Sequence, residues 1–236
     1  MQPYAIIPFL LLVFCTYAGP VSHLFHVRSE ARNKPELWIV PQPLQLDSGV
    51  PASGKIFCSF GYQFDSPWTD VSTERKQGTV DALIFSGGQG LMIVDESKTT
   101  DPIANGQKPE DAKGVQAVKA LFGYAFRSQV LNATPADLRW FATRQHMASS
   151  STLITLKILD APHMQGGMYS FQTPWFRGFQ IGSPSRDQSV TIEAYDPQDL
   201  KIRIMIGSHA APGEKFSQSD INQIISTLRP ASPSCN

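Results

Sequence analysis

Apolar and polar residues alternate along several stretches of the chain with a period of two, which is typical of a β-strand with one buried face. The clearest stretch is 55–65, which we expect to form one continuous strand. Its inward face would be formed by Ile56, Cys58, Phe60, Tyr62 and Phe64. Further strands are expected at residues 36–40, 80–85, 91–94, 168–173, 176–181, 189–195 and 201–206.

Helices are indicated where apolar residues recur every three or four positions behind a capping residue. A first helix is expected to open at Pro109 and to run through Phe126, and a second to begin with Thr134 as its N-cap. Residues 152–159 fit either a buried strand or a buried helix, and their periodicity does not separate the two.

The last helix has the most complete signals. Ser217 is its N-cap, and Asp220 three residues later completes a capping box. Its apolar stripe consists of Ile221, Ile224, Ile225 and Leu228. Pro230 ends it. The order of strands, helices, strands and helix predicts an α+β fold, with a mainly antiparallel sheet and helices packed on its faces as an α/β/α sandwich.

The chain begins with an apolar leader. Residues 4–18 are strongly apolar, and no Asp, Glu, Lys or Arg precedes Arg28. One interpretation is a signal peptide cleaved after Ala18, which would make the protein periplasmic or extracellular. The other is an uncleaved transmembrane helix over residues 4–25, which would tether the protein to the membrane. Length favours export, because an apolar run of about 15 residues is short for a span of ~20.

The remaining organisation follows from composition. Residues 1–25 form the signal peptide or anchor, and 26–50 form a polar tether and leading segment. We expect one α+β domain over 51–230 and a short tail at 231–236. Lys and Arg balance Asp and Glu, 20 against 20, so the chain lacks the basic surface that nucleic acids require and no nucleic-acid partner is expected.

The three cysteines are Cys15, Cys58 and Cys235, and none belongs to a C-x-x-C pair. In an oxidising compartment, Cys58 and Cys235 could form a disulfide. The alternative is a buried thiol at Cys58 and an unpaired Cys235 in a loose tail. The position of Cys235 beside the C-terminus favours this alternative.

No assembled catalytic motif is present. The chain has no G-x-S-x-G, no S-x-x-K and no H-E-x-x-H, so we predict no catalytic, cofactor-binding or metal-binding residue. The Gly-rich stretch 86–90 is followed by a strand rather than a helix, which indicates a hairpin and not a phosphate loop. A hydrolase with a distributed site is the alternative, and it would require His146, His163 or His209 beside a serine or carboxylate.

The candidate binding residues are aromatic or basic. Trp68 follows Pro67, after the longest expected strand. Trp175 and Arg177 lie around an expected turn. Exposed Trp and Arg side chains are enriched in partner-binding surfaces. The competing interpretation is packing, in which Trp175 and Phe179 cover the sheet edge and Arg177 is solvated, and the residue types favour packing.

Two segments carry a resemblance to a known family. The stretch from Gly61 to Trp68, G-Y-Q-F-D-S-P-W, resembles an early strand of PsbP/Mog1-like domains, and residues 221–228 resemble their closing helix. The resemblance implies an α/β/α sandwich over roughly residues 50–230. It also implies a non-catalytic accessory or binding protein that acts on an unknown protein or small ligand. The alternatives are another family of exported bacterial proteins of the same construction, and a structural envelope protein.

Overall fold

The structure is a computed structural model that describes residues 29, 38–46, 54–96, 123–134, 156–157, 167–184, 189–208 and 216–235. The chain divides into two compact units. One combines residues 1–40 with 130–162, and the other combines residues 41–129 with 163–236.

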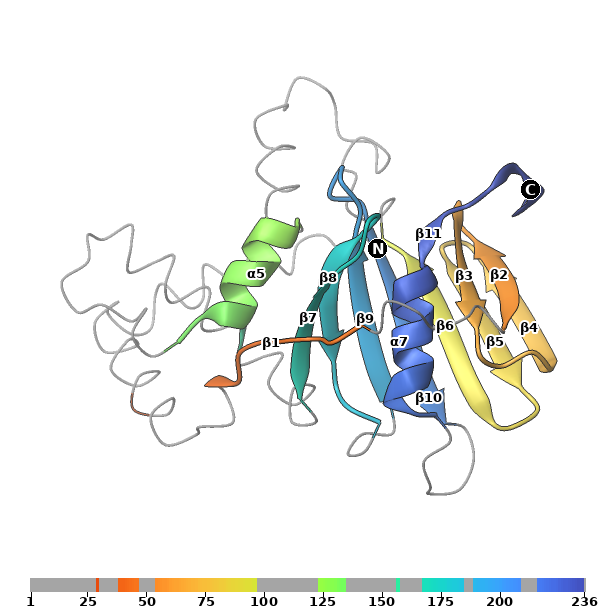
Figure 1. The fold of residues 1–236 in the computed structure, drawn as a ribbon, viewed down its shortest axis with the longest axis horizontal. Helices are drawn as coiled ribbons and strands as arrows, with labels where there is room; N and C mark the ends of the chain where they lie inside the picture. Colours follow the sequence, from red (N-terminus) through yellow and green to blue (C-terminus); the bar gives the residue numbers. More distant parts are fainter. Residues whose placement is uncertain are drawn as a thin grey trace, which may run out of the picture. The chain divides into compact units, whose positions relative to one another are not determined.

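An eight-stranded sheet dominates the larger unit, in the order β1-β7-β8-β9-β10-β6-β5-β4 (Figure 1). Only β1 and β7 pair in parallel, and every other neighbouring pair is antiparallel. The strands are β1 (Gln42–Pro43), β4 (Val71–Gln77), β5 (Val80–Phe85), β6 (Gln89–Asp95), β7 (Met168–Gln172), β8 (Arg177–Ile181), β9 (Ser189–Tyr195) and β10 (Lys201–Ser208). The prediction of a mixed α/β chain with a mainly antiparallel sheet is therefore confirmed.

The prediction of one strand over 55–65 is wrong, because this stretch is a hairpin. β2 (Lys55–Ser59) and β3 (Tyr62–Ser66) pair antiparallel around Phe60 and Gly61, whose φ angles are 52° and 80°. Two central residues with positive φ are typical of the tight turn that suits β-hairpins. The alternation runs through this turn unchanged, so the sequence pattern does not reveal it.

The hairpin also changes which side chains face the core. Phe57 lies opposite Phe64, and both pack against the core, whereas Ile56 is 53 % exposed. The prediction that Ile56 and Cys58 face the core is therefore wrong. The two-residue turn shifts the inward positions by one residue, and such a shift moves a side chain to the other face of the sheet.

β4 was not expected from the sequence. Its residues after Val71 are all polar or charged and exposed. An edge strand needs no apolar alternation when neither face is buried, and charged side chains protect its free edge from other chains. Residues 38–40, which fall in the strand expected at 36–40, form no strand.

Two α-helices are described over their whole length, α5 (Tyr124–Asn132) and α7 (Gln218–Thr227). α7 has the expected capping box between Ser217 and Asp220. The helix expected from Pro109 lies outside the described residues except for its last four positions, of which the final three fall in α5. Most of the helix expected from Thr134 also lies outside them, and within 152–159 Leu156 and Lys157 are helical.

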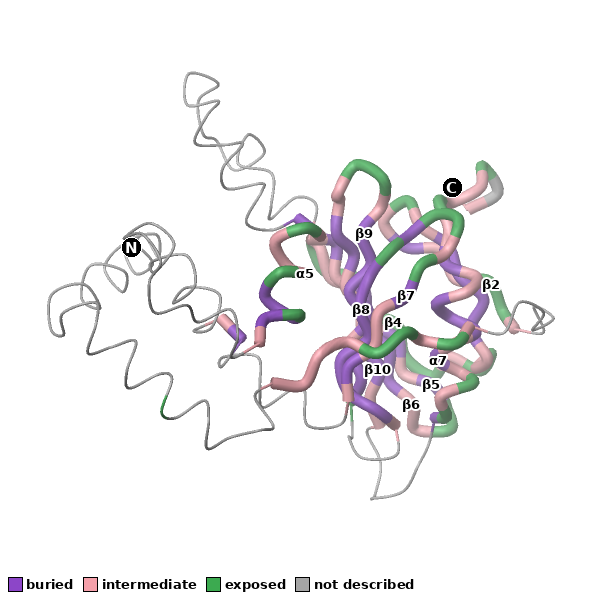
Figure 2. Tube along the Cα trace, turned by 60° about the vertical axis from the view of Figure 1, so that its left-hand side comes forward, coloured by how far each residue is buried: buried purple, intermediate pink, exposed green. Residues whose placement is uncertain are grey.

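The core of the larger unit forms where α7 meets the main sheet (Figure 1). The four residues of the predicted stripe, three on α7 and the fourth its C-cap Leu228, are fully buried. They pack with alternate residues of β9 and β10, which are Val190, Ile192, Ala194, Ile202, Ile204 and Ile206. In Figure 2 the buried segments run along β8, β9 and β10. The strand alternation and the helix stripe thus bury one common apolar layer.

In the described part of the smaller unit, a buried lysine binds backbone carbonyl groups. Lys157 is 1 % exposed, and its Nζ donates hydrogen bonds to the carbonyls of Leu131 (2.8 Å) and Ala133 (2.6 Å). Its ammonium also lies 5.8 Å from the centre of the Trp38 ring. Lys157 therefore satisfies carbonyls at the end of a helix, which would otherwise lack partners.

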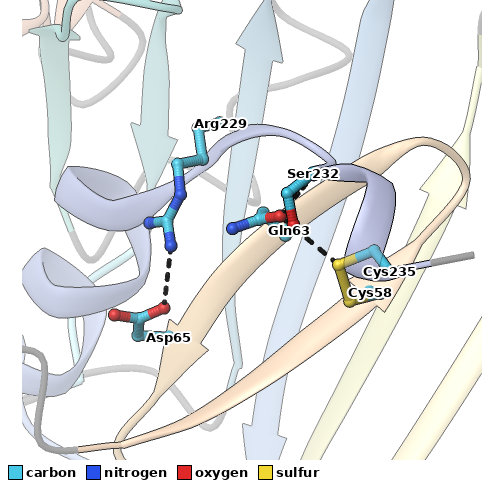
Figure 3. Close-up of a disulfide and its surroundings, with 6 residues drawn as sticks. All are labelled: Cys58, Gln63, Asp65, Arg229, Ser232 and Cys235. Atoms are coloured by element: carbon cyan, nitrogen blue, oxygen red, sulfur yellow. Dashed lines mark hydrogen bonds and ion pairs between the residues drawn. A yellow bond between two sulfur atoms is a disulfide. The ribbon is translucent and has the colours of Figure 1, made fainter.

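The C-terminal segment is bound to the β2–β3 hairpin by a disulfide, by strand pairing and by a hydrogen bond (Figure 3). Cys58 and Cys235 form a disulfide, so the interpretation of two separate thiols is wrong. β11 (Arg229–Pro230) pairs with β3, and the backbone N–H of Ser232 donates to Oε1 of Gln63 at 2.6 Å. The Sγ of Cys235 lies 3.3 Å from the same oxygen, a contact only, because a bridged sulfur carries no hydrogen. A short 3₁₀ helix, η5 (Pro233–Cys235), ends the described chain.

The prediction of a transmembrane helix is wrong for the part of the chain that the structure describes, where no helix combines the length and apolarity needed to cross a bilayer. The leader at residues 4–25, to which both the anchor and the signal-peptide interpretations refer, lies outside the described residues.

Candidate functional site

The turn between β7 and β8 presents a tryptophan to solvent. The N–H of Thr173 donates to the carbonyl of Phe176 at 2.7 Å and closes the turn. The Thr173 hydroxyl in turn accepts the N–H groups of Trp175 (3.3 Å) and Phe176 (3.0 Å). Phe176 is buried in the core, whereas Trp175 is 51 % exposed. The backbone of the turn is thus held on both sides of an exposed indole.

The turn between β9 and β10 is held by an aspartate. Oδ1 of Asp196 accepts the N–H groups of Gln198 (2.8 Å) and Leu200 (2.9 Å). Asp199 takes the left-handed conformation with φ of 62°, which aspartate tolerates better than most residues. β8 pairs with β9 so that Arg177 lies opposite Tyr195, which places both turns at the same end of the sheet.

A hollow of about 320 Å³ lies between these two turns, and we call it the hairpin hollow. It is lined by Gln172, Thr173, Pro174, Trp175, Phe176, Arg177, Tyr195, Asp196 and Pro197. Nη2 of Arg177 lies 2.9 Å from Oδ1 of Asp199, so this ion pair links the two turns. The hollow falls within the range of small-molecule sites, at its lower end.

The guanidinium of Arg177 is also held by an aromatic ring. Its Cζ lies 4.4 Å from the centre of the Tyr124 ring, close enough for a cation–π contact. Tyr124 stacks on Phe179 with ring centres 5.2 Å apart, and it meets Tyr195 edge to face at 5.7 Å. Arg177 is therefore oriented by Asp199 on one side and by Tyr124 on the other.

An ionic cluster adjoins these rings. It is formed by Arg127, Glu193, Lys201, Glu96 and Arg203. Glu193 is 3 % exposed and receives two hydrogen bonds from the Arg127 guanidinium. Lys201 and Arg203 bridge Glu193 to Glu96. Burial by itself raises the pKa of Glu193, but the three cations outweigh burial and hold this pKa below its ordinary value.

The adjoining Tyr195 is 1 % exposed, and its hydroxyl has no hydrogen-bond partner in the structure. Burial raises the pKa of Tyr195 strongly, and the charge of Glu193 raises it further. Tyr195 therefore stays neutral at physiological pH, and its ring serves as a wall of the hollow.

Of the candidate residues named from the sequence, the structure brings Trp175 and Arg177 together in the hairpin hollow. Trp68 is not among the lining residues, and it packs instead on Phe85 with ring centres 5.4 Å apart. The packing interpretation holds for Phe179, which is 1 % exposed, but not for Trp175. Partner binding by Trp68, Trp175 and Arg177 stays a prediction.

Sequence reasoning missed Tyr195, Asp196 and Tyr124 as members of this region. The sequence indicates Tyr195 only as the end of the strand at 189–195. Their place beside Trp175 depends on the pairing of β8 with β9, which no local pattern reveals.

The hydrolase alternative depends on His146, His163 and His209, which lie outside the described residues. Among the residues that the structure describes, no group of three or more His, Cys, Asp or Glu is placed to hold a metal ion. Comparison of the chain with protein-family models, curated proteins and solved structures finds no match.

Proposed function

We propose that this chain is an exported, non-catalytic binding or accessory protein, and that it takes its ligand or partner at the hairpin hollow. The observation that carries the proposal is the exposed indole of Trp175, held on a closed turn beside a hollow that also contains Arg177. Tryptophan and arginine contribute most to binding where a rigid surface positions them.

The disulfide supports export. Cys58 and Cys235 are joined across 177 positions of sequence. Such bonds persist in the periplasm, the secretory pathway and the extracellular space, whereas cytosolic thiols are kept reduced. The apolar leader of the sequence agrees with this compartment.

For the finer architecture, we propose the α/β/α sandwich of PsbP/Mog1-like domains. Two sets of contacts support it. Residues of α7 pack with Val190 and Ile192 of β9, while Tyr124 and Arg127 of α5 contact Phe179 and Glu193. Because neighbouring residues of a strand point to opposite faces, Ile192 and Glu193 mark the two faces of the sheet.

The proposal is tested by binding of a panel of metabolites, lipids and short peptides, with the melting temperature as the first readout. A ligand of the folded state raises this temperature. For each compound that binds, Trp175→Ala should raise the Kd about tenfold or more, the effect of losing a central aromatic anchor.

Ile56→Ala is the matched control, because Ile56 is the other large apolar residue found exposed among the described residues and it does not line the hollow. Equal affinities for wild type and Trp175→Ala would refute the proposed site. Absence of any ligand from the panel would favour the structural envelope protein instead.

A further inference from the structure

Resting on this proposed function, we infer that the hairpin hollow selects small carboxylates with an apolar or aromatic body. In this arrangement the carboxylate is bound by Arg177, in exchange for Asp199, and the apolar body lies against Trp175.

Arg177 has donors to spare. A guanidinium carries five N–H groups in a rigid plane and binds carboxylates best through two of them. In the structure, Asp199 receives one hydrogen bond from Arg177, through Nη2. The Tyr124 ring contacts the guanidinium without using any of these donors. Arg177 is therefore oriented but not saturated.

The pairing with Asp199 is easily exchanged. The side chains of Arg177 and Asp199 are 46 % and 40 % exposed, so solvent screens their attraction. A ligand carboxylate that makes two hydrogen bonds and places its body on the indole would compete well with this single contact. Glu193, by contrast, is held by three buried or half-buried cations and is not exchangeable in this way.

The other charged side chain of the lining, Asp196, already accepts hydrogen bonds from the backbone. Oδ1 of Asp196 accepts two backbone N–H groups of its own turn. These donors offset part of the charge of Asp196, which leaves Arg177 as the charged group that is oriented for a ligand. The lining also contains Pro174, Trp175 and Pro197, which suit an apolar body.

The size of the hollow limits the ligand. A volume of about 320 Å³ equals roughly ten water molecules at ~30 Å³ each. This is room for a molecule the size of an aromatic amino acid, or for one terminal residue of a peptide. A free acid and a peptide C-terminus share this chemistry, and the test includes both.

The test compares phenylpropionate with its amide, which has the same shape but no charge, in calorimetric titrations of the full chain at neutral pH. A short peptide that ends in Phe, with a free or an amidated C-terminus, forms the second pair of probes. We expect each acid to bind about tenfold more tightly than its amide, the scale of one charge-assisted contact.

Four variants, one of them a control, separate the contributions. Arg177→Gln should remove the preference for the acid, and the exposed Arg75→Gln on β4 should keep it. Asp199→Asn should strengthen binding of the acid by up to about fivefold, because the competing carboxylate is gone. Asp199→Asn also keeps the inference testable if Arg177→Gln fails to fold. Trp175→Ala should weaken acid and amide alike.

The outcomes distinguish this inference from the proposed function. Acid and amide of equal affinity, both dependent on Trp175, would overturn the selectivity and leave the binding site standing. Binding that is independent of Trp175 would overturn both. No binding of any of the four probes would overturn the assigned ligand class.

Discussion

The guanidinium of Arg127 holds both carboxylate oxygens of Glu193, with Nε 2.8 Å from Oε2 and Nη2 3.1 Å from Oε1. The contact joins α5 to the middle of β9, across 66 positions of sequence. Glu193 is 3 % exposed, and a carboxylate removed from water to this extent is stable as an ion only with such partners. The pair therefore fixes the part of α5 that also positions Tyr124 beneath Arg177.

Replacing Glu193 with glutamine should destabilise the fold. The amide keeps the size of the side chain but leaves Arg127 and Lys201 without their shared anion. Breaking a buried ion pair costs about 3–5 kcal/mol in the free energy of unfolding. Urea denaturation measures the loss, with the exposed Glu74→Gln as a control expected to stay within about 0.5 kcal/mol of wild type. Equal stability of the two variants would show that the cluster is not a stabilising element.

The same pair predicts a pH dependence. The pKa of Glu193 is lowered from its ordinary value of 4.5, so the folded protein binds this proton less tightly than the unfolded chain does. The stabilisation from Glu193 is therefore complete above the unfolded pKa and is lost as pH falls through the folded pKa. The difference in unfolding free energy between wild type and Glu193→Gln should shrink below about pH 4.5. A difference that stays constant down to acidic pH would contradict the assignment.

Much of the sheet could be predicted from local pattern. The strands expected at 80–85 and 189–195 have the bounds of β5 and β9, and the Ser217 cap is as expected. In these segments the periodicity, the turn residues and the burial agree, so local sequence is sufficient.

The misses have physical causes. The apolar residues alternate without a break from Ile56 to Phe64, although the two-residue turn at Gly61 shifts the inward positions by one, so that Phe57 and not Ile56 faces the core with Phe64. Neither face of the strand β4 is buried, so its sequence has no alternation of apolar and polar residues. The hairpin hollow depends on the pairing of β8 with β9, and the disulfide depends on β11 returning to β3. The first is a matter of register between two successive strands, and the second joins residues 177 positions apart.

Gly61→Ala should test the hairpin turn. Gly61 has φ of 80°, and a Cβ built there meets no atom within 4 Å, so the cost is conformational and not steric. We expect a loss of about 1 kcal/mol in unfolding free energy for alanine and a smaller loss for asparagine, which tolerates this region better. Denaturation of Gly61→Ala and Gly61→Asn makes the comparison. Equal stability of wild type and both variants would argue against the turn.

Gly178→Ala should be more harmful, for a different reason. The backbone of Gly178 is not left-handed, but an added Cβ would collide with the carbonyl oxygen of Glu193 on the neighbouring strand. The strands β8 and β9 would have to separate next to the hairpin hollow. We expect this loss to exceed that of Gly61→Ala, measured by the same denaturation. A Gly178→Ala protein as stable as wild type would contradict the close approach of these strands.

Removal of the Cys58–Cys235 bridge should destabilise the protein by about 2–4 kcal/mol, because the unfolded chain gains freedom when a long loop is opened. Protein prepared without reductant should lose this amount when dithiothreitol is added to a urea titration. The double variant Cys58→Ser with Cys235→Ser should start at the lower stability and show no further response to reductant, which controls for other effects of the reagent. Alkylation adds a direct measurement, because neither cysteine should react in the folded, unreduced protein. Labelling of both cysteines in protein isolated from an oxidising compartment would contradict the bridge, and it would remove the structural support for export.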